Sequence, residues 1–384
     1  MARLPETFEH VFVDPHAHLR EPSSINKSED LESGTRAALK GGAVAVYDIF
    51  NTPGHHTTTL DRGIEKQALA YMKALIPTGF YYGFQPEAGG NEVDDINEKI
   101  ADIFAGLKVF LDVSTGIDKK EIDPFDFEEQ FVTWHGLAPN KPIMFHLGKN
   151  NLGICIELAE KNDLIVHIFH VNNPDDVESI DGARNRGVRI SCGVCTHHLV
   201  LTDDDVKRLN WFARMKPPLV SAADSEKLRH QFNAGKIQVL ETDHAPHPKA
   251  MKEAANRENP EGLDDLNLPR PYGVPGLEAA MPIIFNEVEQ GRIEYQRLKE
   301  ATSVEPLKLM NARLSRQTKV VWRRGKPREF TESDIVSKCG HSPYIGKRIV
   351  GEVVEVVING KLVVRGGEII GRKPQVLWGN KDVI

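Results

Sequence analysis

The chain has 384 residues, of which 40% are hydrophobic and 27% are charged, with a net charge of -7 and a pI near 6.1. It is long enough to bury one large core and to carry a small additional unit. Its acidic balance argues against a nucleic-acid surface, which needs concentrated Lys and Arg. No apolar run approaches the roughly 18 residues of a membrane span, and residues 1–6 lack a signal-peptide core. We therefore expect a cytoplasmic protein that binds neither nucleic acid nor membrane.

Four cysteines in a chain of this length are too few for a disulfide scaffold, which indicates a reducing compartment. Cys192 and Cys195 have the spacing of a zinc or redox pair, but the sequence holds no second such pair to complete a four-sulfur site. Because a free Cys behaves as a small hydrophobe, we interpret the two as buried thiols on a strand.

Apolar, strand-like runs alternate regularly with amphipathic, helix-like stretches along most of the chain. There are eight such runs: 10–14, 43–49, 76–83, 107–112, 142–147, 164–171, 188–194 and 237–242. Helices are expected after most of them, for example over 30–39, 59–75, 151–161 and 175–186. Eight alternations predict an α/β fold, a parallel (β/α)8 barrel of the TIM type. An open doubly wound sheet normally has a Gly-rich turn after its first strand, whereas His16, His18 and Arg20 follow the first strand here.

The pattern changes after the eighth strand. Residues 245–275, rich in Pro, Asn and charge, are too many for a plain connection and are expected to lie over the barrel mouth. Helices are expected over 277–290 and 294–309, and residues 353–364 are typical of a hairpin with an Asn-Gly turn. We predict a barrel over residues 1–317 and a small C-terminal β appendage over 318–384 that packs on the barrel.

Metal-compatible side chains follow several of the predicted strands. All strands of a parallel barrel point their C-terminal ends at one mouth, so these residues converge there. His16 and His18 are two apart in extended chain and face the same side, where they can bind one cation. The alternative is a pair of surface histidines, which the adjacent Asp14 makes less favoured because its carboxylate can orient a ring.

The predicted fourth strand contains a lysine, Lys108, within an otherwise apolar run. An unpaired buried ammonium group is costly. Lys108 therefore either lies at the strand end and extends to solvent, or its pKa is lowered by burial and nearby metal. In the second case the neutral amine adds carbon dioxide and becomes a carbamate that bridges two metals.

The later strands end in similar residues. His146 ends the fifth strand, and His167 and His170 have opposite parity on the sixth, so we expect only one of them to face the interior. His170, nearer the C-terminal end, is the better ligand, and His167 is expected to pack against the helices. The seventh and eighth strands are followed by Thr196, His197, His198 and Asp243. So many metal-compatible side chains at one mouth predict a metal site.

In these motifs the sequence resembles dihydroorotase, the cyclic amide hydrolase family of pyrimidine synthesis within the amidohydrolase superfamily. The resemblance runs along nearly the whole chain, through residues 14–22, 51–52, 106–108, 196–199, 217–219, 242–247 and 273–278. The Asp-His-Ala-Pro-His sequence over 243–247 is its most specific part.

The resemblance implies a function and roles for individual residues. The reaction is the reversible cyclisation of N-carbamoyl-L-aspartate to (S)-dihydroorotate, with Asp243 moving the proton. The resemblance also implies a homo-oligomer associated with aspartate transcarbamoylase. One zinc ion would be bound by His16, His18 and Asp243, a second by His146 and His170, and both by carboxylated Lys108. The substrate would be bound by Arg20, Asn51, His247 and Lys216.

The sequence also departs from the family pattern. Gly148 and Gly193 stand where the family usually has Glu, and Lys216 where it has Asn or Arg. The N-terminal half of the family's β appendage is absent, so we expect that sheet to rest on C-terminal strands alone. Two alternatives stay open: another cyclic amide or ureide hydrolase, hydantoinase- or allantoinase-like, and a weakly active dihydroorotase-like scaffold for aspartate transcarbamoylase. The intact set of metal ligands favours catalysis.

Overall fold

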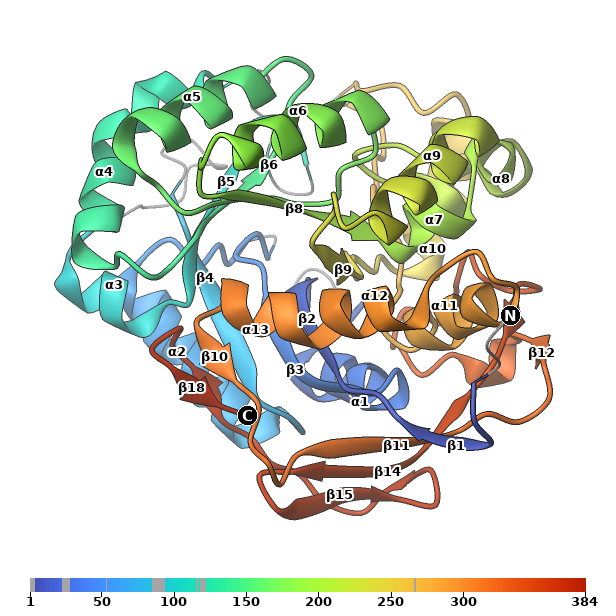
Figure 1. Cartoon of the computed structure of the whole chain (residues 1–384). Coiled ribbons are helices and arrows are strands. Elements are labelled where there is room, and N and C mark those ends of the chain that lie inside the picture. The colour runs from blue at the N-terminus through green and yellow to red at the C-terminus, as the bar shows by residue number, and fades with distance from the viewer. Residues whose placement is uncertain are drawn as a thin grey trace.

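A computed structural model describes residues 4–22, 28–52, 54–84, 94–114, 117, 122–265 and 267–384. Eight parallel strands, each hydrogen-bonded to the next in chain order, form a nearly closed barrel at the centre of the molecule (Figure 1). The predicted (β/α)8 barrel is confirmed. Its strands are β2 (Phe12–Ala17), β3 (Ala43–Asp48), β4 (Thr78–Gly83), β5 (Gly106–Phe110), β6 (Ile143–His146), β7 (Val166–Ile168), β8 (Ile190–Cys195) and β9 (Val239–Glu241).

These strands are buried along almost their whole length, because helices cover the outer face and side chains fill the interior. The barrel closes between β9 and β2. There Ala17 and His244 form an isolated bridge, and the backbone N–H of His18 donates to the carbonyl of His244 at 2.7 Å.

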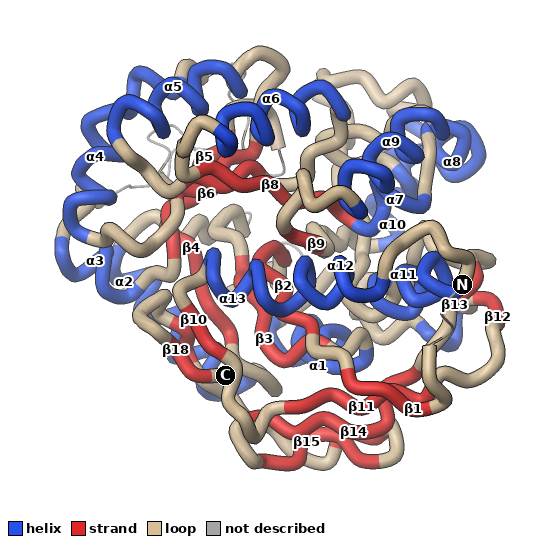
Figure 2. The backbone as a smooth tube through the Cα atoms, in the orientation of Figure 1, coloured by secondary structure: helices blue, strands red, loops and turns tan. Residues whose placement is uncertain are grey.

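Helices surround the strands (Figure 2). The predicted helices are present with boundaries within a few residues, and none in the described ranges combines the length and apolarity that a membrane span requires. The helices are α1 (Leu31–Lys40), α2 (Leu60–Lys73), α3 (Glu98–Ile103), α4 (Glu128–Leu137), α5 (Leu152–Asn162), α6 (Pro174–Asn185), α7 (Thr196–Val200), α8 (Asp203–Leu209), α9 (Ala222–Asn233), α10 (Lys249–Glu258), α11 (Ala280–Glu289), α12 (Tyr295–Lys299) and α13 (Glu305–Leu309). Short 3-10 turns lie at Pro124–Phe127, Asn210–Ala213 and Glu332–Asp334, and a π turn at Glu300–Val304 joins α12 to α13.

A second, antiparallel sheet packs below α1 (Figure 1). Its order is β1 (Thr7–Glu9), β11 (Lys319–Arg323), β14 (Glu352–Ile358), β15 (Lys361–Arg365) and β16 (Glu368–Ile369). The predicted hairpin is β14 and β15, and its turn residues Asn359 and Gly360 both have positive φ, 49° and 77°, as a type I′ turn requires. We propose that this sheet is the core of the small unit expected from residue 318.

The N-terminal strand corrects one expectation about this sheet. β1 pairs antiparallel with β11, so the sheet does not rest on C-terminal strands alone. The chain also returns to the barrel near its end, where β17 (Val376–Leu377) pairs with β4. Two further short pairs join β10 (Ala312–Arg313) to β18 (Asp382–Val383) and β12 (Arg328–Glu329) to β13 (Arg348–Ile349).

Candidate metal centre

Three metal-compatible side chains meet where β2 and β9 end. The Nε2 atoms of His16 and His18 lie 3.2 and 3.0 Å from Oδ1 of Asp243, and all three residues are buried. Their ligand atoms lie within 4.8 Å of one another. Two imidazole nitrogens and a carboxylate oxygen suit Zn²⁺. The structure thus brings together the three residues expected to bind one metal ion.

A neighbouring side chain fixes the orientation of His18. Its Nδ1–H donates to Oδ1 of Asn51 at 2.8 Å, which leaves the lone pair on Nε2, the nitrogen that faces Asp243. A metal-binding histidine is usually held in this way. Asn51, which the resemblance assigns to the substrate, therefore also orients a metal-ligand candidate.

Asp14 joins the two strands instead of orienting a ring. Its Oδ1 accepts from the backbone N–H groups of His16 and Thr242, both at 3.2 Å, and its Oδ2 accepts from the Thr242 hydroxyl at 2.5 Å. Burial raises the pKa of Asp14 to about 6, and these hydrogen bonds oppose that rise. The expectation that Asp14 receives an imidazole N–H is corrected, because backbone and hydroxyl donors occupy its oxygens.

His146 and His170 form the other half of the site. His146 ends β6, His170 lies two residues beyond β7, and Nδ1 of His146 is 2.8 Å from Nε2 of His170. The ring centroids of His170 and His16 are 5.1 Å apart, so the two halves adjoin. Burial lowers the pKa of both His146 and His170 well below the usual value, which keeps the imidazoles neutral and able to bind metal.

Lys108 lies in the middle of β5 and is completely buried. Its Nζ is 4.6 Å from the ring centroid of Phe110 and 4.3 Å from that of Phe169. Among the residues that the structure describes, this nitrogen has no hydrogen-bond partner. Burial lowers the pKa of Lys108 to about 7, although Glu241 and Asp243 act in the opposite direction. The alternative in which this side chain extends to solvent is wrong.

Glu241 is a site residue that the sequence analysis missed. It ends β9 and is completely buried. Its Oε1 accepts from the backbone N–H of His170, and its Oε2 lies 3.5 Å from Nδ1 of His16, so this carboxylate contacts both halves of the site. A charged residue in an apolar strand was the signal that drew attention to Lys108, and the same signal is present at Glu241.

The Glu241 carboxyl group fills the space beside Gly193 on the neighbouring strand β8. A Cβ atom at Gly193 would lie 2.8 Å from the carboxyl carbon of Glu241. The family pattern has Glu at position 193, so a carboxylate enters this space here from a different strand. Gly148 is also closely packed, since a Cβ there would lie 2.4 Å from Oδ1 of Asn151.

The expectation that only one of His167 and His170 faces the interior is wrong. β7 ends at Ile168 and His170 has a φ of 43°, so the alternation of a strand does not extend to it. Nε2 of His167 lies 4.0 Å from Oε2 of Glu241, and its Nδ1 is 2.8 Å from the hydroxyl of Ser191. Both histidines therefore reach the site.

The residues expected to bind substrate do not all line the same space. Arg20, Asn51 and Lys216 line a cavity of about 20 Å³ together with the metal-ligand candidates, with room for about one water molecule. Arg20 is buried and donates from Nη1 to the backbone carbonyl of Asn51 at 3.4 Å. His247 does not line this cavity. Its Nε2–H donates to the backbone carbonyl of Tyr272 at 2.7 Å.

A larger pocket of about 520 Å³ lies beside His146 and His170, and its size suits a small organic substrate. Lys216 lines both spaces, and its Nζ lies 3.0 Å from Oδ2 of Asp264 and 4.8 Å from the ring centroid of Tyr272. Because Asp264 and Tyr272 belong to the segment 245–275, that segment lines the mouth as expected.

Sequence comparison finds relatives along almost the whole chain. It is 30% identical over 369 residues to the multifunctional protein pyr1-3 of Dictyostelium discoideum, a match that covers 94% of this chain and 15% of that protein. It is 27% identical to the dihydroorotase of Staphylococcus epidermidis and 29% identical to that of Clostridioides difficile, and each match covers at least 91% of this chain and 86% of the relative. This chain spans about 15% of the length of the multifunctional relatives. No family model matches the chain.

Solved structures share the fold. The L-hydantoinase (dihydropyrimidinase) of Arthrobacter aurescens has a TM-score of 0.81 at 22% identity, over 98% of this chain and 88% of that one. The inactive dihydroorotase-like domain of the Chaetomium thermophilum CAD-like multifunctional protein has a TM-score of 0.72 at 15% identity, over 97% and 99%. The barrel carries a metal-compatible cluster at its mouth, and these solved structures share its fold. Along nearly its whole length, the chain is similar in sequence to dihydroorotases, at 27–29% identity.

Proposed function

We propose that this chain is a zinc-dependent dihydroorotase that interconverts N-carbamoyl-L-aspartate and (S)-dihydroorotate. One observation carries the proposal: side chains from β2, β5 and the ends of β6, β7 and β9 meet at one buried mouth. They are His16, His18, Lys108, His146, His170 and Asp243. The dihydroorotase relatives support the choice of substrate.

The residues present fit two zinc ions. In the described part of the chain, Nζ of Lys108 and Nδ1 of His16 are buried without hydrogen-bond partners, as is Oε2 of Glu241. Buried polar atoms without partners are costly and rare in folded proteins. When bound, zinc would polarise the amide carbonyl and make water a nucleophile near neutral pH.

Lys108 would hold both ions after a covalent change. With its pKa at about 7, much of the amine is uncharged near neutral pH. The Nζ lone pair forms a bond to the carbon of carbon dioxide, and the amine releases one proton. The product is a carbamate with one negative charge and two oxygen atoms for two metal ions.

Asp243 would move the proton. Burial raises the pKa of Asp243 to about 8, so its carboxyl group can both accept and return a proton near neutral pH. In the ring-opening direction it takes a proton from the attacking water and delivers it to the departing amide nitrogen. The guanidinium of Arg20, which lines the same cavity, matches the substrate carboxylate.

Metal analysis combined with a turnover assay tests the proposal. The purified chain is expected to bind about two zinc ions besides any other zinc site and to interconvert the two compounds. Asp243→Asn is expected to lower kcat by about 10²- to 10⁴-fold with the fold retained. Asp126→Asn, at an exposed carboxylate in the turn Pro124–Phe127, is the matched control. Turnover unchanged in Asp243→Asn would refute the role of Asp243.

The same assay separates the alternatives. Hydantoin or allantoin turned over in place of dihydroorotate would favour another cyclic amide hydrolase. Two bound zinc ions without turnover of any of these compounds would favour a scaffold. We also propose a cytoplasmic homo-oligomer that associates with aspartate transcarbamoylase. This is supported by the multifunctional relatives and by four cysteines that are all free.

A further inference from the structure

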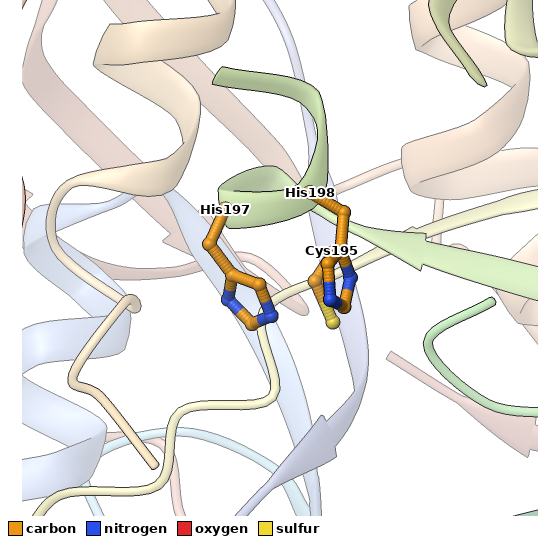
Figure 3. Close-up of side chains that lie close together, drawn as sticks. All are labelled: Cys195, His197 and His198. Atoms are coloured by element: carbon orange, nitrogen blue, oxygen red, sulfur yellow. The ribbon is translucent and has the colours of Figure 1, made fainter. Parts of the chain in front are cut away.

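A second group of metal-compatible side chains lies at the end of β8, outside the set described above. Figure 3 shows Cys195, the last residue of β8, beside His197 and His198 from the first turn of α7. One ligand atom from each lies within 4.8 Å of the other two, and all three residues are buried. The cluster forms because the chain turns directly from strand into helix at Cys195.

The histidines of this cluster have unusual surroundings. Neither ring nitrogen of His197, nor Nδ1 of His198, has a hydrogen-bond partner within the described ranges. Both rings are completely buried. Burying an imidazole without partners is costly, so the environment favours a ligand that satisfies these nitrogens.

The hydrogen bond that His198 does make prepares it to bind a metal. Its Nε2–H donates to the backbone carbonyl of Pro217 at 3.3 Å, which leaves the lone pair on Nδ1. A donated N–H to a backbone carbonyl is the usual arrangement behind a metal-binding histidine. Burial lowers the pKa of His198 to about 4, so its ring is neutral at physiological pH.

We propose that Cys195, His197 and His198 bind a structural zinc ion, separate from the catalytic site. One thiolate and two imidazoles are a borderline-soft donor set that zinc prefers. Burial raises the pKa of the Cys195 thiol, so the metal must displace the thiol proton when it binds. The Tyr344 hydroxyl, which is buried without a hydrogen-bond partner among the described residues, interacts electrostatically with the Cys195 thiol.

Cys192 provides an internal contrast. It is three residues earlier on β8 and therefore points to the opposite face of the strand. Its Sγ lies 3.8 Å from the backbone carbonyl of Lys236 and is not part of the cluster. The two buried thiols, alike in sequence, thus have different surroundings.

The position of the cluster indicates what the metal would do. It would hold the end of β8 against α7. Through the bond from His198 to Pro217 it would also fix the backbone next to Lys216, which lines both the central cavity and the larger pocket. The metal would therefore stabilise one wall of the substrate pocket without touching the substrate.

Cobalt substitution separates this site from the catalytic one. The proposed catalytic ligands include no thiolate, so only the Cys195 site can give a thiolate-to-cobalt charge-transfer band in the near ultraviolet. The full-length chain loaded with Co²⁺ is expected to show this band. Cys195→Ser should lose it together with about one equivalent of bound zinc, whereas Cys192→Ser should keep both.

Absence of the band from the wild-type protein, or its persistence in Cys195→Ser, would overturn the proposal. If Cys195→Ser fails to fold, His197→Gln replaces it, and loss of about one zinc equivalent with the fold retained is the expected result. An unchanged zinc content in that variant would contradict the proposal. Dihydroorotase turnover is measured on the same zinc-loaded samples. A wild-type protein with the band but without turnover would refute the proposed function and leave this site supported.

Discussion

Two buried lysines, Lys108 in the barrel and Lys252 in the segment over its mouth, have the same burial and different surroundings. Both side chains are completely buried, and burial lowers the pKa of each to about 7. Nζ of Lys252 donates to three backbone carbonyls, those of Trp211, Pro271 and Gly273, at 2.6–2.7 Å. Nζ of Lys108 has two aromatic rings beside it and no hydrogen-bond acceptor among the described residues.

Hydrogen-bond partners, and not burial or pKa, therefore separate a structural lysine from a reactive one. An ammonium group has three donors, and Lys252 uses all of them to join α10 to the turn Asn210–Ala213 and to residues 271–273. Lys108 uses none, so its amine is available for covalent chemistry. The two lysines therefore predict opposite results on substitution.

Lys108→Ala is expected to have the largest effect on activity. Removing the group that holds both metal ions should lower kcat/KM by about 10³-fold or more and reduce the zinc content. The metal-free variant should be at least as stable as the metal-free wild type, because a buried amine without hydrogen-bond partners is removed. Metal analysis, turnover and urea unfolding measure the three quantities.

A small carboxylic acid provides the control for Lys108→Ala. Its carboxylate can occupy the space of the missing carbamate, so added acetate or propionate should restore part of the activity and zinc content. The same variant with full zinc content and no response to these acids would refute a carbamate at Lys108.

Lys252→Met is expected to have the opposite profile. Three buried carbonyls would lose their donor, at about 1–3 kcal/mol each, so the free energy of unfolding should fall by about 3 kcal/mol or more. At temperatures where the variant is folded, it should bind zinc normally and keep kcat within about tenfold of the wild type. Lys249→Met, at an exposed position of α10, is the matched control and should change neither. A Lys252→Met protein as stable as that control would contradict the structural role.

Glu241 contacts both metal-ligand pairs, through the backbone N–H of His170 and Nδ1 of His16. Because such outer partners shift metal affinity by about ten- to a hundredfold, Glu241→Ala should weaken zinc binding by that factor in a chelator competition. Gly193→Glu alone should destabilise the protein, since its Cβ would lie 2.8 Å from the Glu241 carboxyl carbon.

The double substitution Gly193→Glu with Glu241→Ala removes that clash and returns a carboxylate from β8. It should recover part of the zinc affinity that Glu241→Ala loses. Gly136→Glu, at an exposed glycine with nothing within 4 Å of its Cβ position, is the neutral control. A double variant no better than Glu241→Ala would show that the two positions do not supply one carboxylate.

The barrel could be predicted from the sequence because its strands are buried on both faces. They read as short, nearly continuous apolar runs, and all eight correspond to strands. The ligand candidates followed from the same fact, since residues such as His146 and Asp243 stand where apolar runs stop. Ends of parallel strands converge whatever their distance in sequence.

Other features depend on local geometry that the sequence does not express. The parity argument failed for His170 because β7 ends at Ile168 and His170 itself has a positive φ, so the alternation of the strand does not reach it. In the sequence, Glu241 looks like part of the motif that follows it. The space that its carboxyl group fills lies beside Gly193 on the neighbouring strand β8, which the sequence does not reveal. β1 has three residues and pairs with a strand more than 300 residues away, too short and too distant for periodicity to indicate.

His167, beside the metal centre, and His10, a structural residue, are both buried histidines. Burial lowers the pKa of both His167 and His10 to about 3, and Lys108 and Lys299, respectively, lower it further. His167 lies beside the Glu241 carboxylate, whereas His10 is hydrogen-bonded to the Thr302 hydroxyl at 3.0 Å, far from the metal-ligand candidates in the fold.

In the unfolded chain both histidines bind protons below about pH 6.5, whereas in the folded chain they stay neutral down to about pH 3. Their contribution to stability is therefore complete above pH 6.5 and is lost as the pH falls toward 3. Each adds up to about 1.4 kcal/mol per pH unit to the slope of the unfolding free energy.

Urea unfolding of the metal-free protein at a series of pH values measures this slope. His10→Gln should reduce the slope by up to about 1.4 kcal/mol per pH unit, which corresponds to one proton, and should leave zinc binding unchanged. An unaltered slope would show that His10 is protonated in the folded state. Zinc binding that weakened together with the slope would show that His10 and the metal centre are coupled through β2, because Phe12 lies only two residues beyond His10 and begins the strand that carries His16.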